Sequence, residues 1–204
     1  MSLFKKNKYP AHLRENLSFG KQAFIFAWEI AKVVVISLAI IVPVRYFLIK
    51  PFYVLGASME PNFYNHEYLI INEISYYFSE PKRGDTVVVK DPFDPRQYFI
   101  KRVVGLPGEE IRISAGQVYI HGQNNPGGEV LAEDYLAPGT KTLGEVFVKI
   151  KAGEYYLWGD NRSASLDSRM FGPVKRDQII GKTLLRGWPL SRFGLVINNA
   201  EYNF

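Results

Sequence analysis

The sequence predicts a mainly β domain that follows one membrane-spanning helix, and three observations lead to this fold class. An uncharged apolar run occupies residues 33–44, near the start of the chain. After residue 50, short runs rich in Val, Ile, Tyr and Phe are separated by Gly, Pro, Asp and Asn, as in antiparallel sheets. No segment after residue 50 has the strong periodicity of an amphipathic helix.

The apolar run is long enough to span a membrane when its flanks are included. Residues 27–47 would form about 31 Å of helix at 1.5 Å per residue. Glu29 and Lys32 lie three residues apart and can pair, and Pro43 is tolerated near the end of such a helix. A cleaved signal peptide is disfavoured because no small-residue cleavage site follows Val44, and a buried core helix is the other alternative.

The charge distribution predicts how the chain is oriented in the membrane. The formal charge is +5, and residues 1–50 hold eight Lys or Arg against two Glu, which leaves the remainder at −1. A nucleic-acid binder would carry its positive charge on the folded domain, so no nucleic-acid partner is expected. A basic tail before one span predicts a single-pass protein of the cytoplasmic membrane with a cytoplasmic N-terminus.

We therefore expect a basic cytoplasmic tail over residues 1–24, a transmembrane anchor over 25–48, and an extracytoplasmic β-rich domain over 49–204. The runs expected as strands are 68–77, 85–90, 98–106, 110–122, 146–150 and 154–159. The tetrapeptide SAGQ at 114–117 predicts a hairpin turn, and 91–97 predicts a longer hairpin loop. Residues 124–145 are rich in loop-forming residues and are expected to be irregular.

Ser58, in the turn sequence GASMEP, is a candidate nucleophile only if a base lies near it. The chain has no cysteine, which excludes a thiol nucleophile, a disulfide framework and a thiolate metal site. His12 lies in the tail, and His66 and His121 lie in turn sequences without an acidic partner pattern. A Ser-His-Asp triad is therefore disfavoured, and no histidine spacing indicates a metal site.

A buried lysine is the next candidate base. A free lysine, with a pKa of about 10.4, is almost wholly protonated near neutral pH, whereas burial disfavours its charged form. In YFIKRVV, strand alternation places Phe99, Lys101 and Val103 on one face, so Lys101 has apolar neighbours. Lys90 and Lys149 lie at strand ends and can reach water. Snorkelling of Lys101 at a sheet edge is the alternative reading.

Four short motifs, taken in their order along the chain, resemble those of a known protein family. They are GASMEP at 56–61, KRGDTVVV at 82–89, YFIKRVVGLPGE at 98–109 and GDNRSASLDSRMFG at 159–172. The set resembles the motifs of the bacterial type I signal peptidases, which are membrane-anchored serine proteases with a Ser/Lys dyad. The likeness runs from about residue 45 to about residue 195.

The resemblance implies a role for each matching residue. Ser58 matches the nucleophile, with its backbone N–H as an oxyanion donor, and Lys101 matches the general base. Ser165 matches the serine whose hydroxyl orients that lysine. Arg102 follows the lysine and is expected to pair with Asp160. The charged positions of the last motif also include Asp167 and Arg169.

The resemblance also implies the fold, the substrates and the surroundings of the domain. It implies a barrel-like domain of coiled antiparallel sheets that acts as a monomer beside the lipid bilayer, without a cofactor or metal. The substrates would be membrane-bound preproteins with small residues at the first and third positions before the cut.

This chain departs from the family pattern at several places. Gly56 stands where many members have a serine that helps to stabilise the oxyanion, so no side-chain donor is carried over. Asn62 replaces a commoner threonine, and Phe99 replaces a frequent tyrosine. The segment 108–156 is short, so a large second subdomain is not expected.

Two other functions are compatible with parts of this pattern. A self-cleaving repressor of the SOS type also uses a Ser/Lys dyad, but it would need a DNA-binding domain where this chain has an apolar span. A membrane-anchored β-domain that binds peptides without catalysis is the alternative from a different class. Eukaryotic-type signal peptidases use histidine in place of the lysine, and the sequence IKR argues against that branch.

Overall fold

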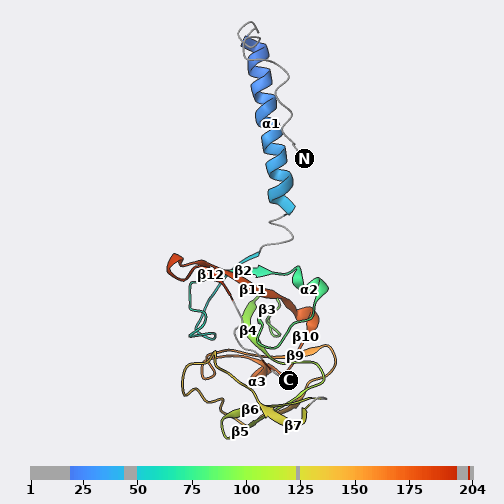
Figure 1. Cartoon of the computed structure of the whole chain (residues 1–204), viewed down its shortest axis with the longest axis vertical. Coiled ribbons are helices and arrows are strands. Elements are labelled where there is room, and N and C mark those ends of the chain that lie inside the picture. Colours follow the sequence, from blue (N-terminus) through green and yellow to red (C-terminus); the bar gives the residue numbers. More distant parts are fainter. Residues whose placement is uncertain (1–18, 44–49, 123–124, 197–201, 203–204) are drawn as a thin grey trace. The chain divides into compact units, whose positions relative to one another are not determined.

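The computed structural model describes residues 19–43, 50–122, 125–196 and 202 (Figure 1). The chain divides into two compact units, with the boundary between Tyr46 and Phe47. The first unit contains the helix α1 and the second contains all the described strands.

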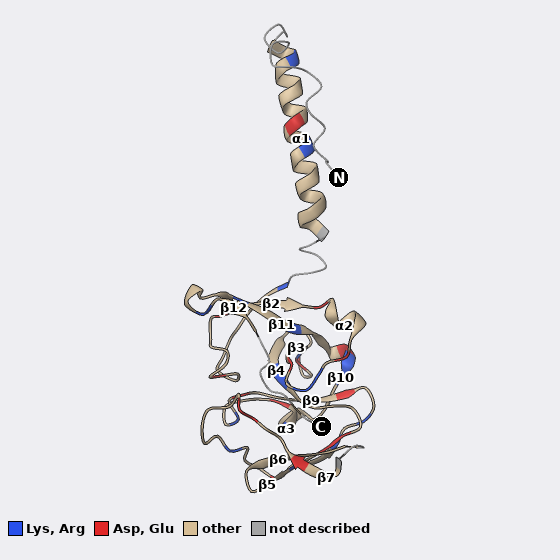
Figure 2. Cartoon of the chain, viewed as in Figure 1, with Lys and Arg blue, Asp and Glu red and all other residues tan. Residues whose placement is uncertain are grey.

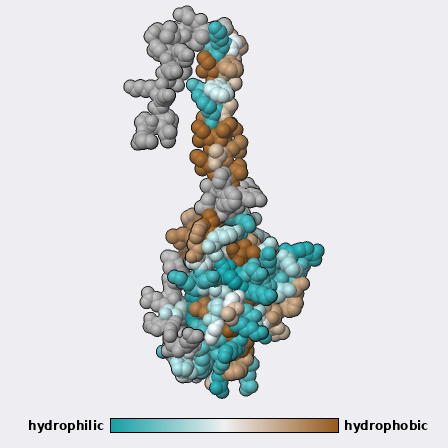
Figure 3. All heavy atoms as spheres, turned by 90° about the vertical axis from the view of Figure 1, so that its right-hand side faces the viewer, coloured by the Kyte–Doolittle hydropathy of each residue, from teal (hydrophilic) through white to brown (hydrophobic). Residues whose placement is uncertain are grey.

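Helix α1 (Phe19–Pro43) is the one helix among the described residues that is long and apolar enough to cross a membrane. Its 25 residues correspond to about 37 Å at the usual rise. Its C-terminal part has no charged residue (Figure 2) and is apolar (Figure 3). The helix begins before the expected anchor of 25–48, and residues 44–48 of that anchor lie outside the described residues.

The second unit is mainly β, as predicted, and every described strand pair is antiparallel. Its elements are β1 (Lys50–Tyr53), β2 (Tyr68–Asn72), α2 (Ser75–Phe78), β3 (Thr86–Lys90), β4 (Tyr98–Gly105), β5 (Glu110–Ser114), β6 (Gln117–Gly122), β7 (Asn125–Val130), β8 (Phe147–Lys149), β9 (Glu154–Trp158), α3 (Ser168–Phe171), β10 (Val174–Lys175), η3 (Arg176–Gln178), β11 (Ile179–Trp188), η4 (Leu190–Arg192) and β12 (Gly194–Leu195).

These strands form two sheets. The larger has the order β1-β2-β11-β3-β4-β9-β10, with β12 added to β11, and the smaller has the order β7-β6-β5-β8. Register shifts interrupt several pairings of the larger sheet, among them β11 with β2 and β4 with β9. Such bulges bend strands and increase twist, which fits the coiled sheets that the sequence predicted.

Three local expectations differ from the structure. The run 68–77 is a strand only to Asn72, where the Asn72 side chain accepts the N–H of Ser75 in a local turn that leads into the short helix α2. Strand β7 lies in the segment expected to be irregular, where pairing with β6 holds it extended. The ten-residue strand β11 was not predicted, although it joins β2 to β3. The hairpins at 91–97 and 114–117 are confirmed.

Strand β4 lies inside the larger sheet, between β3 and β9. Lys101 is opposite Val87 of β3, and Arg102 is opposite both Thr86 of β3 and Trp158 of β9. Lys101 is 2% exposed in this interior strand, so its side chain does not reach water. The snorkelling alternative is therefore wrong for this lysine, which is buried.

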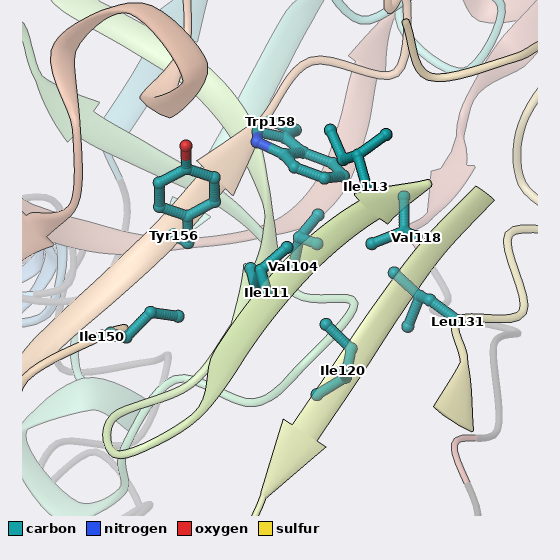
Figure 4. Packing of buried hydrophobic residues seen from close by; sticks show 9 residues of the cluster. All are labelled: Val104, Ile111, Ile113, Val118, Ile120, Leu131, Ile150, Tyr156 and Trp158. Carbon is teal, nitrogen blue, oxygen red and sulfur yellow. The ribbon is translucent and has the colours of Figure 1, made fainter. Parts of the chain in front are cut away.

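Buried apolar side chains form three clusters around these sheets. The first joins the two sheets, because it combines side chains of β4 and β9 with those of β5 and β6 (Figure 4). Val87 and Val89 belong to the second cluster and Val88 to the third, so both faces of β3 are covered. The members of the first cluster are Val104, Ile111, Ile113, Val118, Ile120, Leu131, Ile150, Tyr156 and Trp158.

Candidate active site

Ser58 lies in the irregular turn that joins β1 to β2. Gly56 has a φ of +92°, a left-handed conformation that glycine adopts without the steric cost of a Cβ atom. Met59 and Phe63 are almost wholly buried, and the Phe63 N–H donates to the Met59 carbonyl at 2.9 Å. These two side chains anchor the turn in the core and leave Ser58 partly exposed.

Lys101 points at Ser58 from strand β4, which β11 and β3 separate from β2 in the sheet. Its Nζ atom lies 2.9 Å from Ser58 Oγ, within hydrogen-bond distance. The lysine is 2% exposed, and its Nζ lies 5.2 Å from the centre of the Phe99 ring. The structure therefore brings together the serine and the lysine that strand alternation selected.

The surroundings of Lys101 favour its neutral form. Burial lowers the pKa of Lys101 to about 8, although Asp167 and Asp160 oppose this shift and Arg169 assists it. Only the neutral amine has a lone pair to accept a proton. An appreciable fraction of the lysine is thus ready to act as a base near pH 8.

Arg102 and Asp160 form the ion pair that the family resemblance implied. Arg102 Nε donates to Asp160 Oδ1 at 2.8 Å and Nη2 donates to Oδ2 at 2.6 Å, which is a bidentate geometry. Both side chains are buried. Burial would lower the pKa of Arg102, but the contact with Asp160 outweighs it and raises the pKa. The guanidinium therefore stays charged and offsets the negative charge of Asp160.

Asp167 and Arg169 form a second bidentate pair at the start of α3. Arg169 Nε and Nη2 donate to the two carboxylate oxygens at 2.9 and 2.7 Å, and the Gly159 N–H donates to Asp167 Oδ2 at 3.1 Å. Burial would raise the pKa of Asp167, but these donors lower it overall. This carboxylate therefore stays ionised, and the pair holds the loop of residues 159–169 in shape.

Asn161 joins this loop to the turn of Ser58, and the sequence alone assigns it no role. Its backbone N–H donates to the Ser58 carbonyl at 3.0 Å, and its side-chain amide donates to the Ala57 carbonyl at 3.1 Å. Beside it, a Cβ atom on Gly159 would lie 2.4 Å from the Ser58 carbonyl oxygen, so only glycine fits. The only signal in the sequence was the GDN tripeptide of the last motif.

Ser165 does not make the expected contact in this structure. Its Oγ atom is buried and has no well-formed hydrogen bond among the described residues, so the bond to Lys101 is not formed. The hydroxyl lies against Gly159, where an added Cβ atom would be 2.2 Å from it, and it is near enough to Asp167 to help to lower the pKa of that carboxylate. A buried hydroxyl without a well-aligned hydrogen bond costs free energy, which favours a rotation of the Ser165 side chain that forms one.

A small cavity of about 120 Å³ adjoins the dyad. Ser58 and Lys101 form one end of its wall, and apolar side chains form most of the rest. Phe52 and Tyr98 contact each other edge to face in this wall, with ring centres 5.5 Å apart. The other wall residues are Tyr53, Val54, Leu55, Leu69, Val88, Phe99 and Ile100.

The histidines do not form a catalytic or metal centre with these residues. His66 contacts the Tyr53 hydroxyl, and His121 lies in β6. His12 lies outside the described residues. Within the described part of the chain, no group of three or more His, Cys, Asp or Glu side chains could hold a metal ion.

Comparison with known proteins matches residues 27–188 to the family described as signal peptidase, peptidase S26. A probable signal peptidase I-2 from Synechocystis sp. is 37% identical over 85% of this chain and 78% of its own length. A signal peptidase I from Leptolyngbya laminosa is 35% identical over 80% of each chain. A crystal structure of a signal peptidase I from Enterococcus faecalis V583 aligns with 51% of this chain and 97% of its own, with 28% identity and a TM-score of 0.43.

If Lys101 is the base, peptide hydrolysis should depend on the neutral amine. Activity should fall as the pH drops below the Lys101 pKa of about 8, and the acidic limb of the kcat/KM profile reports that value. Lys101→Arg should be inactive because a guanidinium stays protonated. Lys101→Ala should be equally inactive and still folded. A rate that keeps rising past about pH 10, or an active arginine variant, would place the base elsewhere.

If the Ser165 hydroxyl turns to Lys101 during catalysis, Ser165→Ala should lower kcat roughly 5- to 150-fold, the usual cost of one buried hydrogen bond. The variant should keep the thermal midpoint of the wild type within a few degrees. Ser114→Ala, which changes an exposed serine of the β5–β6 hairpin, is the control. Wild-type turnover by Ser165→Ala would show that this residue only shapes its loop.

Proposed function

Because the chain belongs to the S26 family of signal peptidases, we propose that it removes signal peptides from exported preproteins at a membrane surface. Ser58 is the nucleophile in this proposal, and Lys101 is the general base. The observation that carries it is the 2.9 Å contact between Lys101 Nζ and Ser58 Oγ, made by a lysine that is 2% exposed. A domain that only bound peptides would gain nothing from a buried amine against a serine.

The proposed reaction begins when neutral Lys101 accepts the proton of the Ser58 hydroxyl. The serine oxygen attacks the carbonyl carbon of the scissile bond and forms a tetrahedral intermediate. As the C–N bond breaks, the Lys101 ammonium gives its proton to the leaving amine, which is the new N-terminus of the mature protein. Neutral Lys101 then takes a proton from a water molecule, which attacks the acyl carbon. As the ester bond to Ser58 breaks, the Lys101 ammonium returns the proton to the Ser58 oxygen.

The oxyanion of the intermediate needs hydrogen-bond donors near Ser58. The Ser58 N–H makes no hydrogen bond to another described residue, so it is available for this role. Gly56 has no side chain and contributes no hydroxyl donor. We propose that the Ser58 N–H is the main donor and that the exposed backbone of the turn gives the substrate carbonyl room to approach it.

The cavity beside the dyad supports a preference for small substrate residues. Its volume of about 120 Å³ can accept small side chains in the extended peptide before the cut. The Phe52–Tyr98 contact closes part of its wall. A large aromatic side chain in the substrate would have to displace these packed residues, at a cost of about 1–3 kcal/mol or more.

The domain surface supports action at a membrane. Exposed apolar side chains gather on β1, β2, β11 and β12, which are neighbours in the sheet order, and on the turn η4 before β12. Leu190 and Leu195, for example, are 71% and 67% exposed. Strand β1 begins only seven residues after α1 ends, so the chain leaves little length between the anchor and this end of the sheet. We propose that these side chains contact lipid and that the domain lies on the extracytoplasmic side of the cytoplasmic membrane.

The function is tested with a model preprotein in detergent. Wild type should release the mature protein, whereas Ser58→Ala should leave the precursor intact. A precursor with Phe in place of the small residue before the cut should resist cleavage, because the cavity has no room for the ring. Failure of wild type to cleave any preprotein would support the alternative of a non-catalytic peptide-binding domain. Efficient cleavage of the Phe precursor would disprove the specificity.

The orientation is tested with single cysteines, since the natural chain has none. A cysteine in place of Ser2 should be shielded from an impermeant thiol reagent in intact cells. A cysteine in place of Gly127, an exposed residue of β7, should react. The basic tail predicts this pattern because positive charges stay in the cytoplasm. The reverse pattern would place the domain on the cytoplasmic side and contradict its access to exported preproteins.

A further inference from the structure

Asn62 occupies a junction four residues after the nucleophile. Its backbone N–H donates to the carbonyl of Met59, the residue that follows Ser58, at 3.0 Å. Asn62 is half-buried, and its side-chain amide points away from this turn to other parts of the domain. Any movement of Asn62 would therefore be transmitted directly to the turn of Ser58.

The Asn62 side chain joins the turn to the Arg102–Asp160 pair. Asn62 Nδ2 donates to Asp160 Oδ2 at 2.8 Å and to the Tyr135 carbonyl at 2.7 Å. The same Asp160 oxygen accepts from Arg102 Nη2 at 2.6 Å. The Arg102 guanidinium also lies over the Tyr135 ring, 4.1 Å from its centre. The two N–H groups of the amide thus join the turn of Ser58 to Asp160 and to the segment that contains Tyr135.

The Asn62 carbonyl is held from the opposite direction by two arginines. Arg186 Nη2 and Arg192 Nη2 donate to it at 2.6 and 3.1 Å. Both arginines also bind the carboxylate of Glu67, through Arg186 Nε at 2.9 Å and Arg192 Nη1 at 2.5 Å. Glu67 is 1% exposed. Two partly exposed arginines that share one buried carboxylate allow little freedom to the carbonyl that both of them bind.

We propose that Asn62 is a positioning residue of the catalytic site, which holds Asp160 and the turn of Ser58 in one fixed arrangement. This inference rests on the proposed function, in which Ser58 and Lys101 are the catalytic dyad that the arrangement serves. Asn62 touches neither reacting group, and it acts through Asp160 on one side and through Met59 on the other.

An amide suits this position better than its close relatives. Threonine, the commoner family residue here, offers one hydroxyl donor, whereas Asn62 supplies two donors to two acceptors. Aspartate has the same shape but would set two carboxylates about 2.8 Å apart. Like charges at that distance disfavour ionisation of both groups, so an aspartate would push the turn and Asp160 apart.

The arrangement also affects the base. The charged groups that act on Lys101 are Asp167, Asp160 and Arg169, and both aspartates raise the pKa that burial lowers. Removing Asn62 takes away the partial positive charge of an N–H group beside Asp160, so the carboxylate acts more strongly on Lys101. The pKa of Lys101 should then rise, and a smaller fraction of the amine should be neutral at pH 8.

The test compares Asn62→Ala with Asn72→Ala in the full-length protein in detergent. Asn72 is a matched control, because it is also half-buried and its side chain accepts one hydrogen bond, from the Ser75 N–H at 3.0 Å. Asn62→Ala should lower kcat roughly 10- to 150-fold with KM changed less than about twofold, and should move the acidic limb of kcat/KM to higher pH. Asn72→Ala should keep the wild-type kcat and pH profile.

Two further variants separate positioning from a general loss of folding. Asn62→Thr restores one donor and should recover part of the rate that Asn62→Ala loses. Asn62→Asp should be the least active variant, and the acidic limb of its kcat/KM profile should have the highest apparent pKa. Wild-type kcat and pH profile in Asn62→Ala would overturn the proposal. An equal loss of kcat in the Ala and Thr variants, with an unmoved acidic limb, would also overturn it and assign Asn62 a purely structural role.

A second readout keeps this inference apart from the peptidase proposal. Acylation of Ser58 by a β-lactam, followed by mass spectrometry across pH, reports activation of the serine without any preprotein. If wild type is acylated but cleaves no preprotein, the proposed function fails and the Asn62 variants still test the positioning. If acylation of wild type and Asn62→Ala has the same pH dependence, the positioning role fails whatever the substrate is.

Discussion

The burial of one lysine amine beside a serine is the constraint on which the rest of the structure depends. Lys101 lies in an interior strand of the larger sheet and is 2% exposed, so its amine has almost no contact with water. Charging an amine in such a place is costly, and this is why its pKa falls to about 8. In a solvated position the same amine would remain an ammonium at neutral pH. The packing around β4 therefore sets the protonation of this lysine.

Two carboxylates near Lys101 oppose the lowering of its pKa, and an arginine paired with each carboxylate offsets its charge. Asp160 is paired with Arg102 and Asp167 with Arg169, each in a bidentate contact. Buried ion pairs of this kind often contribute little net stability, because desolvation cancels much of the attraction. The two pairs have two other effects here. They hold their segments in place, and each arginine reduces the effect of its partner carboxylate on the pKa of Lys101.

The turn of Ser58 has no regular secondary structure of its own, so its shape comes from tertiary contacts. Two buried side chains of the turn anchor it in the core, and Asn161 donates to the carbonyls of Ala57 and Ser58. Asn62 extends the same network to Asp160 and to the arginines around Glu67. A nucleophile on a flexible turn would lose its alignment with the lysine, and these contacts prevent that loss.

The sequence by itself determined the features that depend on local periodicity. The alternation in β4 placed Lys101 beside Phe99 and Val103 because strand side chains alternate whatever their neighbours are. The apolar helix near the N-terminus and the hairpin at 114–117 follow from local composition in the same way. Ser58 became a candidate nucleophile only once this lysine and the four motifs were considered together, and the pairing of Arg102 with Asp160 was expected from family resemblance.

Only the tertiary structure decided which distant residues meet. The Asn62–Asp160 and Asn161–Ala57 contacts join residues 98 and 104 positions apart, and no local pattern encodes such distances. The strand β7 and the long strand β11 also depend on pairing partners outside their own segments. A hydrogen bond between remote residues forms only after the sheets have set their separation, so the supports of the dyad could be identified only from the folded chain.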